Sequence, residues 1–342
     1  MCETSNVSIL VTGAAGFIGS HTAIRLLQRG DQVIGLDNLN DYYSPERKRS
    51  NVREVGQQAR TQHQFEFIEG DIRDRPLLAR VFRQFDVRAV IHLAAMAGVR
   101  VSVDDPWLYY DVNLTGTLNL LEAVRAQSTR ATFVLASTSS AYGATATLPF
   151  AETENADRPL APYAASKRAA ELLGFTYHHL HGLDVTALRF FTVYGPRGRP
   201  DMMAYKVLDS AYGGDAVPYY NNGQMHRDWT FVDDIVSGVV AAADRRLGYE
   251  VINLGRGEPV LLADFVESLE RLAGKKPNLI PKPMLSADVE YTFADISKAR
   301  RLLDYEPKVS VAEGTQRFFE WYLASVQKEV QKDVQKGSGV RG

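Results

Sequence analysis

The sequence has a single cysteine, Cys2, and no long apolar run. One cysteine excludes an intramolecular disulfide and is typical of proteins from a reducing compartment. The longest uncharged stretch, 131–151, is rich in serine, threonine and glycine, so it would not span a bilayer. No basic segment followed by an apolar one precedes the first predicted strand, and no signal peptide is expected. We therefore predict a cytoplasmic chain without a membrane partner.

An excess of one charge is also lacking. The formal net charge is -2, with 39 Lys and Arg against 41 Asp and Glu over 342 residues. A balance of this kind argues against a nucleic-acid partner, and no metal site is predicted. Apolar residues make up 45% of the chain, which suits a packed core. The length fits one large domain or two interlocked domains.

A strand, a glycine-rich turn and a helix follow one another near the N-terminus. Residues 7–12 are apolar, glycines recur from Gly13 to Gly19, and 20–29 has helical apolar spacing. Such glycines let the backbone approach a pyrophosphate, and the helix N-terminus offers unpaired N–H groups. The next strand ends in Asp37, whose carboxylate suits a ribose hydroxyl and would repel a ribose phosphate. The order disfavours a tight turn without a ligand and predicts NAD rather than NADP.

Strands and helices alternate through the first half of the chain. Further buried strands are predicted at 65–68, 88–95 and 131–136, and a long helix at 106–126. Alternation implies a parallel sheet covered on both faces, with ligands above the C-terminal ends of the strands. The predicted fold class is α/β: a Rossmann-type doubly wound parallel sheet with a smaller C-terminal α/β substrate lobe.

The domain boundaries follow from this alternation and from the less regular second half. We predict an NAD-binding domain over 1–188, to which 232–256 returns, and a nucleotide-sugar lobe over 189–325. The charged segment 326–342 is predicted to be a disordered tail. The second half has predicted strands at 184–191 and 251–254 and predicted helices at 233–243, 262–272 and 311–325.

A tyrosine and a lysine four positions apart, Tyr163 and Lys167, share one face of a predicted helix. A free tyrosine has a pKa of about 10, but a nearby ammonium and an oxidised nicotinamide ring favour the phenolate. Lowering that pKa by roughly three units requires about 4 kcal/mol. The pair is consistent with a base that takes the hydroxyl proton of an alcohol while the alcohol is oxidised. An unrelated surface pair is the alternative, which the glycine turn weakens.

Four motifs in order resemble the extended short-chain dehydrogenase/reductase family, at 13–19, 137–143, 163–167 and 227–234. Within that family the chain is most similar to nucleotide-sugar 4-epimerases that act on UDP-glucuronate. The closer similarity is carried by 37–43, 96–100, 189–196 and 198–202. The resemblance covers nearly the whole chain up to about residue 325 and implies 4-epimerisation of UDP-glucuronate to UDP-galacturonate.

The resemblance also implies roles for three catalytic residues. Tyr163 would take the proton from the sugar's 4-hydroxyl while a hydride leaves carbon 4 for NAD. Thr138 would hydrogen-bond the same oxygen, and Lys167 would hold the nicotinamide ribose and keep Tyr163 ionised. The 4-keto sugar would then turn over and take the hydride back on its opposite face, so NAD is regenerated in every turnover.

The predicted ligand-binding residues lie in the glycine turn, at strand ends and in loops. For the cofactor they are Gly13, Gly16, Phe17, Ile18, Gly19, Asp37, Asn38, Asp71, Ile72, Leu93, Ala94, Ala95, Tyr163 and Lys167. For the substrate they are Arg100, Thr138, Ser139, Ser140, Tyr163, Thr192, Arg199 and Arg227.

Within the substrate set, Ser139, Ser140 and Thr192 are short donors suited to a sugar carboxylate. Arg227 resembles the family's diphosphate-binding arginine, and Arg100 would assist it; solvated loop charges are the alternative for both. Arg199 is a candidate guard of the carboxylate, with a diphosphate contact or a surface ion pair as alternatives.

The two positions after Thr138 separate the subfamilies. Related 4,6-dehydratases have Asp and Glu there, and UDP-glucuronate decarboxylases have Glu at the second position. Here both are hydroxyls, Ser139 and Ser140, so the acid and base for elimination are missing and epimerisation is favoured. The serines could instead only satisfy loop backbone. The main alternative is a UDP-glucose/UDP-galactose 4-epimerase; a decarboxylase and a non-catalytic NAD-binding module are less favoured.

A second copy of the chain is the expected protein partner. Relatives pair through two helices of each subunit, which here would be 106–126 and 163–181. Both helices carry adjacent leucines, Leu120–Leu121 and Leu172–Leu173, that present two apolar faces. We therefore predict a homodimer with a UDP-sugar substrate.

Overall fold

The computed structural model describes residues 7–127, 130–145, 147–284 and 289–338, with side chains described as far as 325. Its strands are β1 Val7–Thr12, β2 Gln32–Asp37, β3 Phe65–Glu69, β4 Asp86–His92, β5 Thr132–Thr138, β6 Asp184–Phe190, β7 Thr192–Tyr194, β8 Val217–Tyr220, β9 His226–Phe231, β10 Tyr249–Leu254, β11 Pro259–Leu261, β12 Leu279–Lys282 and β13 Tyr291–Thr292. The α-helices are α1 Phe17–Arg29, α2 Pro45–Gln57, α3 Arg75–Gln84, α4 Val101–Asp104, α5 Pro106–Tyr110, α6 Gly116–Arg125, α7 Pro162–His181, α8 Met203–Gly213, α9 Val232–Ala243, α10 Leu262–Ala273, α11 Ser297–Leu303 and α12 Val311–Ser338.

Seven of these strands form one parallel sheet in the order β10-β6-β5-β4-β1-β2-β3. This is the doubly wound order, in which the strand sequence reverses between β1 and β4 and opens a crevice at their C-terminal ends. The predicted fold class is thus confirmed, and β1 and β2 have the predicted bounds.

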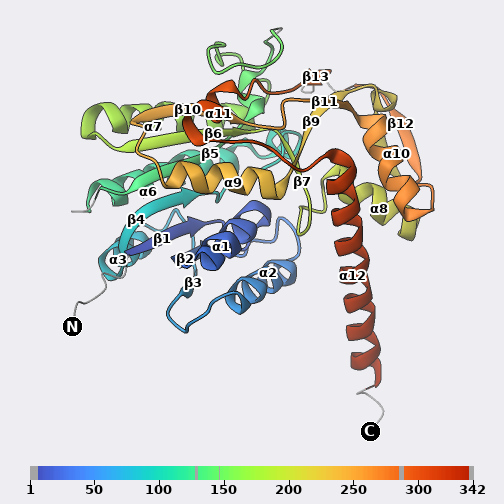
Figure 1. Cartoon of the computed structure of the whole chain (residues 1–342), viewed down its shortest axis with the longest axis horizontal. Coiled ribbons are helices and arrows are strands. Elements are labelled where there is room, and N and C mark those ends of the chain that lie inside the picture. Colours follow the sequence, from blue (N-terminus) through green and yellow to red (C-terminus); the bar gives the residue numbers. More distant parts are fainter. Residues whose placement is uncertain (1–6, 128–129, 146, 285–288, 339–342) are drawn as a thin grey trace.

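Helices cover both faces of the sheet, and β1 shows how the sequence produces this. Ile9 and Val11 pack in one apolar cluster with residues of α1 and α9, whereas Leu10 packs in a second cluster with residues of α3 and α6. Side chains alternate across a strand, so an uninterrupted apolar run supplies both faces. The core therefore has two layers, one on either side of the sheet (Figure 1).

The chain leaves the main sheet after β6 and returns to it. β7 pairs with β9 in a small sheet with β11 and β13, and β8 pairs with β12. Then α9 packs on α1, and β10 adds to the edge of the main sheet beside β6. Helices α8, α10 and α12 gather together at one side of the molecule (Figure 1). The predicted domain boundaries themselves remain predictions.

Two helices differ from their predicted bounds. The helix expected at 106–126 consists of α5 and α6 joined by a π-helical turn, Asp111–Thr115. Asn113 in that turn is buried and bonded to neighbouring loop and helix residues, as described below. Helix α12 extends past 325 to Ser338. The predicted tail, 326–342, lies outside the residues whose side chains are described.

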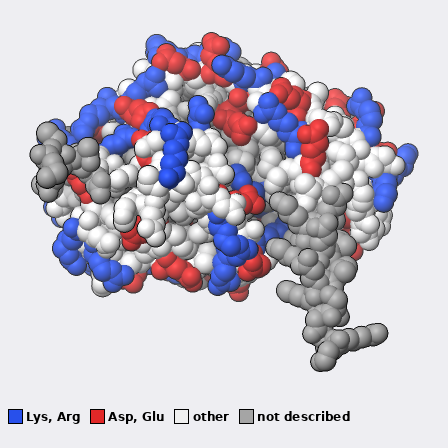
Figure 2. Space-filling view, turned by 60° about the horizontal axis from the view of Figure 1, so that its bottom comes forward, with Lys and Arg blue, Asp and Glu red and all other residues white. Residues whose placement is uncertain are grey.

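The surface matches the balanced composition. Figure 2 shows Lys and Arg interspersed with Asp and Glu over one face, with no field of a single sign among the described residues seen there. Within the described ranges, no helix is long and apolar enough to cross a membrane.

Candidate active site

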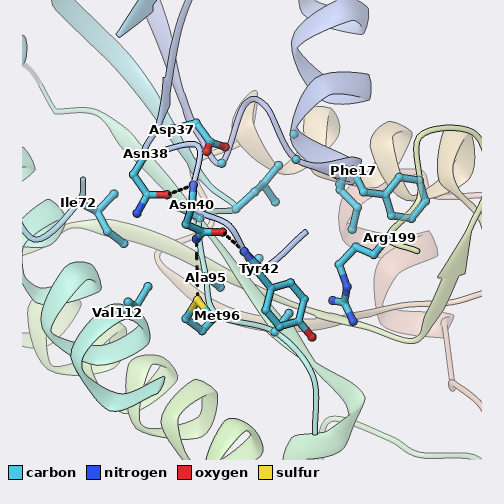
Figure 3. A pocket seen from close by; sticks show the side chains of 18 of the residues that line it. Phe17, Asp37, Asn38, Asn40, Tyr42, Ile72, Ala95, Met96, Val112 and Arg199 are labelled. Atoms are coloured by element: carbon cyan, nitrogen blue, oxygen red, sulfur yellow. Dashed lines mark hydrogen bonds between the residues drawn. The ribbon is translucent and has the colours of Figure 1, made fainter. Parts of the chain in front are cut away.

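A cofactor pocket opens at the reversal point of the main sheet, and Figure 3 shows the side chains around it. Its lining comes from the β1–α1 turn and from the ends of β2, β3 and β4, together with α7. Every residue predicted to bind the cofactor lines this pocket. The remaining lining residues are Leu36, Asn40, Tyr42, Tyr43, Lys48, Gly70, Met96, Ala97, Val112, Ala136, Ser137, Phe190 and Arg199.

The glycine turn is dictated by close backbone contact. Gly13 has φ +73°, and a Cβ there would lie 2.7 Å from the Ala94 nitrogen. A Cβ on Gly19 would lie 1.9 Å from the Gly13 oxygen, so the first turn of α1 could not pack against the loop. Gly16 precedes α1 without a side-chain cap, which leaves first-turn N–H groups for an anion. The turn therefore fits a dinucleotide pyrophosphate.

Asp37 ends β2 at the wall of the pocket, where a ribose is expected. Its carboxylate accepts backbone N–H groups of Ala15 at 3.1 Å and Leu39 at 2.9 Å. Burial raises the pKa of Asp37, while these bonds and the Lys48 ammonium oppose the rise. Lys48 donates to the Asn40 carbonyl at 2.7 Å, and burial lowers its pKa. The donor and acceptor set suits ribose hydroxyls.

Sequence reasoning missed several polar groups of this pocket, among them Asn40, Tyr42, Tyr43 and Lys48. Asn40 accepts the Tyr42 backbone N–H at 3.3 Å and contacts the Met96 sulfur at 3.9 Å (Figure 3). The signal was present, because most of these residues belong to the 37–43 motif that carried the family resemblance.

The proposed catalytic residues meet at one edge of the cofactor pocket. Thr138 is the last residue of β5, while Tyr163 and Lys167 stand in the first turns of α7 and line the pocket. Burial raises the pKa of Tyr163, against which the Arg199 charge and a hydrogen bond with Thr138 act. Burial lowers the pKa of Lys167 to about 8, and the Glu171 carboxylate opposes that change. The pKa of the Lys167 ammonium is thus set by burial and by the Glu171 carboxylate.

A second cavity, the sugar pocket, adjoins the start of α7. It brings Ser139 and Ser140 together with Thr192 and Arg227, which lie far from them in the sequence. The other residues of its wall are Val99, Gly143, Phe150, Leu160, Ala161, Ala164, Val289 and Thr292. Thr138 links the two pockets, because its Oγ1 accepts the Ser140 backbone N–H at 3.1 Å and it also bonds Tyr163.

The two diphosphate candidates stand apart. Arg227 lines the sugar pocket, where its Nη1 donates to the carbonyls of His226 at 2.8 Å and Glu290 at 3.2 Å. Arg100 is not part of that wall; its guanidinium lies 4.0 Å from the centre of the Tyr220 ring at the end of β8.

Arg199 occupies a different place from the one expected of a carboxylate guard. It lines the cofactor pocket and makes a two-pronged ion pair with Asp201, with both distances 2.9 Å. Its guanidinium lies 5.8 Å from the Tyr42 ring centre (Figure 3). Asp201 also accepts the Tyr42 hydroxyl at 3.2 Å. The Arg199 charge also opposes the rise that burial causes in the pKa of Tyr163.

A buried polar network supports the floor of the cofactor pocket and was not foreseen. Asn113 accepts the Met96 N–H at 2.8 Å and donates to the Met96 carbonyl and the Ser166 hydroxyl, both at 3.0 Å. His92 lies between the hydroxyls of Thr12 at 2.8 Å and Thr117 at 3.0 Å. Burial lowers the pKa of His92 to about 3, so its ring is neutral at physiological pH.

Comparison with known proteins agrees with this geometry. A family model described as GDP-mannose 4,6 dehydratase matches residues 10–318. A UDP-glucuronate 4-epimerase from Thermodesulfobacterium geofontis is 45% identical over 319 residues, which are 93% of this chain and 97% of that protein.

Two solved structures have the same fold over nearly their whole length. A UDP-glucuronic acid 4-epimerase from Bacillus cereus, in complex with UDP-glucuronic acid and NAD, superposes with TM-score 0.85 and 34% identity, covering 92% of this chain and 98% of that one. A UDP-glucose 4-epimerase from Thermotoga maritima with UDP-glucose gives TM-score 0.84 and 31% identity, covering 94% and 100%. The chain belongs to the extended short-chain dehydrogenase/reductase family that the matching model represents.

Proposed function

We propose that the protein is an NAD-dependent isomerase that converts UDP-glucuronate to UDP-galacturonate through a transient 4-keto sugar. The observation that carries this proposal is the position of Thr138 between the two pockets. It bonds Tyr163, which lines the cofactor pocket, and accepts the backbone N–H of Ser140, which lines the sugar pocket. The bacterial relatives at 45% and 34% identity bear the name of this activity.

The residues of the chain divide the chemistry between them. NAD, which the glycine turn, Asp37 and Lys167 would hold, would supply the hydride acceptor and donor for carbon 4 of the sugar. Tyr163 as phenolate takes the proton of the 4-hydroxyl and gives it back to the ketone oxygen. Thr138 hydrogen-bonds the same oxygen, and Lys167 lies one helical turn from Tyr163, where its charge favours the phenolate.

Glucuronate makes a particular demand on the site. Its 4-keto form is a β-keto acid, which loses carbon dioxide when the carboxylate bond aligns with the carbonyl π system. Ser139, Ser140 and Thr192 line the sugar pocket and can each donate one hydrogen bond that fixes the carboxylate out of that alignment. A neutral serine at 139 or 140 cannot serve as the acid or base that elimination requires.

Proton NMR of UDP-glucuronate incubated with purified protein tests the function without added NAD. The expected product is UDP-galacturonate, since NAD is regenerated in each turnover and stays bound. A pentose product would identify a decarboxylase. Conversion of UDP-glucose but not UDP-glucuronate would favour the UDP-glucose/UDP-galactose 4-epimerase. No conversion of either sugar, even with NAD added, would contradict an epimerase and favour a non-catalytic module.

We also propose that the active form is a cytoplasmic homodimer. The residues that support pairing differ partly from those used in the sequence argument: Leu120 and Leu121 are both buried within the subunit, while Leu118 on α6 is exposed. On α7, Leu172 and Phe175 are 52% and 51% exposed. Adjacent helices α6 and α7 thus present apolar side chains outward, as a helix-pairing surface requires.

Light scattering at micromolar concentration tests this pairing. The expected mass is twice the 38.0 kDa of one chain. Leu172→Glu should shift the protein towards monomer, because it places a charge on the apolar face. Ile280→Glu, a comparably exposed apolar site on β12, should leave the mass unchanged. A wild-type mass of one chain would contradict the dimer.

A further inference from the structure

Glu171 is a fully buried carboxylate that the reaction scheme does not use. It stands on α7 one turn beyond Lys167, with none of its side chain exposed. A buried charge destabilises the fold unless it is paired and hydrogen-bonded. The hydrogen bonds of Glu171 show which parts of the site it holds together.

The carboxylate joins three elements of the active site. Ser137, next to Thr138 at the end of β5, donates its hydroxyl to Oε1 at 2.5 Å. Arg189, near the end of β6, donates to both oxygens, at 2.9 Å from Nε and 2.7 Å from Nη2. Arg168 on α7 donates to Oε2 at 2.9 Å. Since Ser137 also lines the cofactor pocket, Glu171 fixes part of that wall.

We infer that Glu171 is a positioning residue of the active site: its carboxylate clamps β5 and β6 to α7 and sets a negative charge behind the Lys167 ammonium. The inference rests on the proposed function, in which a charged Lys167 favours the Tyr163 phenolate. Tyr163, Lys167 and Glu171 follow one another at intervals of one helical turn. The inference gives this spacing a function, because it places a base, a cation and an anion in order along α7.

The charges around this stretch come from every element packed on it. Lys167 is acted on by Glu171, while the neutral ring of His92 on β4 lies within its field. Glu171 is itself balanced by the arginines of α7 and β6, and its backbone carbonyl accepts the Tyr249 hydroxyl of β10 at 2.9 Å.

One aromatic ring and one further arginine border the stretch. Tyr142 lies 4.5 Å from the Arg189 guanidinium, measured to the ring centre, and Arg199 faces Tyr163. Removing the Glu171 charge therefore leaves an excess of positive charge behind Lys167, which lowers the pKa of the ammonium.

The decisive experiment is the pH profile of kcat for Glu171→Gln. The pKa of Lys167 is about 8 in the native site, so activity should fall above that pH in the wild-type protein. The variant should lose activity at a pH lower by about one unit, because one charge has been removed at a helical turn's distance. Asp234→Asn, which neutralises another buried carboxylate on α9, is the matched control and should leave the profile in place.

Arg168→Gln provides a second variant with the opposite sign, in case Glu171→Gln does not fold. Arg168 is partly exposed, so its loss disturbs the core less. It removes a positive charge beside Glu171, and the basic limb should move to higher pH. Shifts in opposite directions support the clamp. If kcat falls but the pH at which activity is lost stays the same in every folded variant, the inference is wrong and Glu171 is only a structural ion pair. A wild-type protein without turnover of any UDP-sugar would instead contradict the proposed function.

Discussion

The cofactor pocket and the sugar pocket differ in how the chain builds them. Apart from Arg199, the cofactor pocket is assembled from segments that lie in or follow strands of one parallel sheet, so the sheet topology brings them together. The sugar pocket joins Ser139 and Ser140 after β5 to Thr192 in β7 and Arg227 in β9. It exists only because the small sheet is placed against the main one.

This difference decides what each pocket can specify. Backbone N–H groups and strand ends recognise the parts of a dinucleotide that all relatives share, whereas side chains brought from separate segments can change singly. We infer that the chemistry is fixed in the first pocket and the choice of sugar in the second. Tyr163 belongs to both functions, because it lines the cofactor pocket and, in the proposed mechanism, reacts with the sugar.

The largest expected effect is that of Tyr163→Phe. The variant should lose at least about 100-fold in kcat, since a positioned proton transfer contributes at least that much. NAD should remain bound, because only one hydroxyl of the cofactor pocket is lost. The kcat of the variant and the NAD content of the purified protein measure the two effects separately.

Tyr177→Phe on the same helix is the control for this variant. Its hydroxyl bonds Glu122 at 2.5 Å, far from either pocket, and its removal should leave kcat nearly unchanged. Activity of Tyr163→Phe within tenfold of wild type would reject Tyr163 as the base.

The same difference explains what could be predicted from the sequence. The glycine turn, Asp37 and the Tyr163–Lys167 pair are local patterns whose meaning depends on one strand or one helix. The position of Arg199 depends on how the loop after β7 crosses back over the cofactor domain, which no local pattern records. The π-helical turn around Asn113 could not be predicted from the sequence either. It goes with the tertiary hydrogen bonds of Asn113 to Met96 and Ser166 and not with local helix propensity.

The next effect concerns sugar choice. We expect kcat/KM for UDP-glucuronate to exceed that for UDP-glucose by more than about 100-fold. A hydrogen bond to a charged acceptor is worth about 1.5–3 kcal/mol, and two of them would be lost with a neutral hydroxymethyl group. Thr192→Val keeps the side-chain shape and removes one donor, so the preference should fall by about tenfold or more.

Thr145→Val serves as the control for Thr192→Val. Thr145 lies in the loop after β5 but lines neither pocket, and its hydroxyl bonds Glu154 at 3.4 Å. Ser140→Ala should erode the preference in the same way as Thr192→Val. Similar kcat/KM values for the two sugars, or variants that keep the preference, would place the carboxylate elsewhere.

A smaller effect on product purity is expected at Arg199. Arg199→Gln should allow some pentose to form, since the variant removes a cation from beside Tyr163 and the bond to Asp201 that fixes the loop. The NMR assay that follows UDP-galacturonate detects the pentose directly. If the product stays pure while turnover falls, Arg199 acts on Tyr163 and not on the fate of the carboxylate.

The smallest expected effect tests whether NAD is retained only by the segments of the main sheet or also by the loop after β7. The loop after β7 is fastened to the cofactor domain by His21 on α1, which donates to the Pro196 carbonyl at 2.8 Å, and by an ion pair of Arg197 with Glu54 on α2 at 2.8 Å. The Glu54 side chain is 42% exposed, so this pair is worth about 0.5–1 kcal/mol at most.

Glu54→Gln should therefore speed the release of NAD by about two- to fivefold, measured by displacement with excess labelled cofactor. Glu46→Gln is the matched control, because Glu46 lies on the same helix and forms an exposed ion pair with Arg53 of that helix. A raised ionic strength should reduce the difference between the two variants, since it screens an exposed pair. Equal release rates for both variants would mean that the Arg197–Glu54 ion pair does not help to retain NAD.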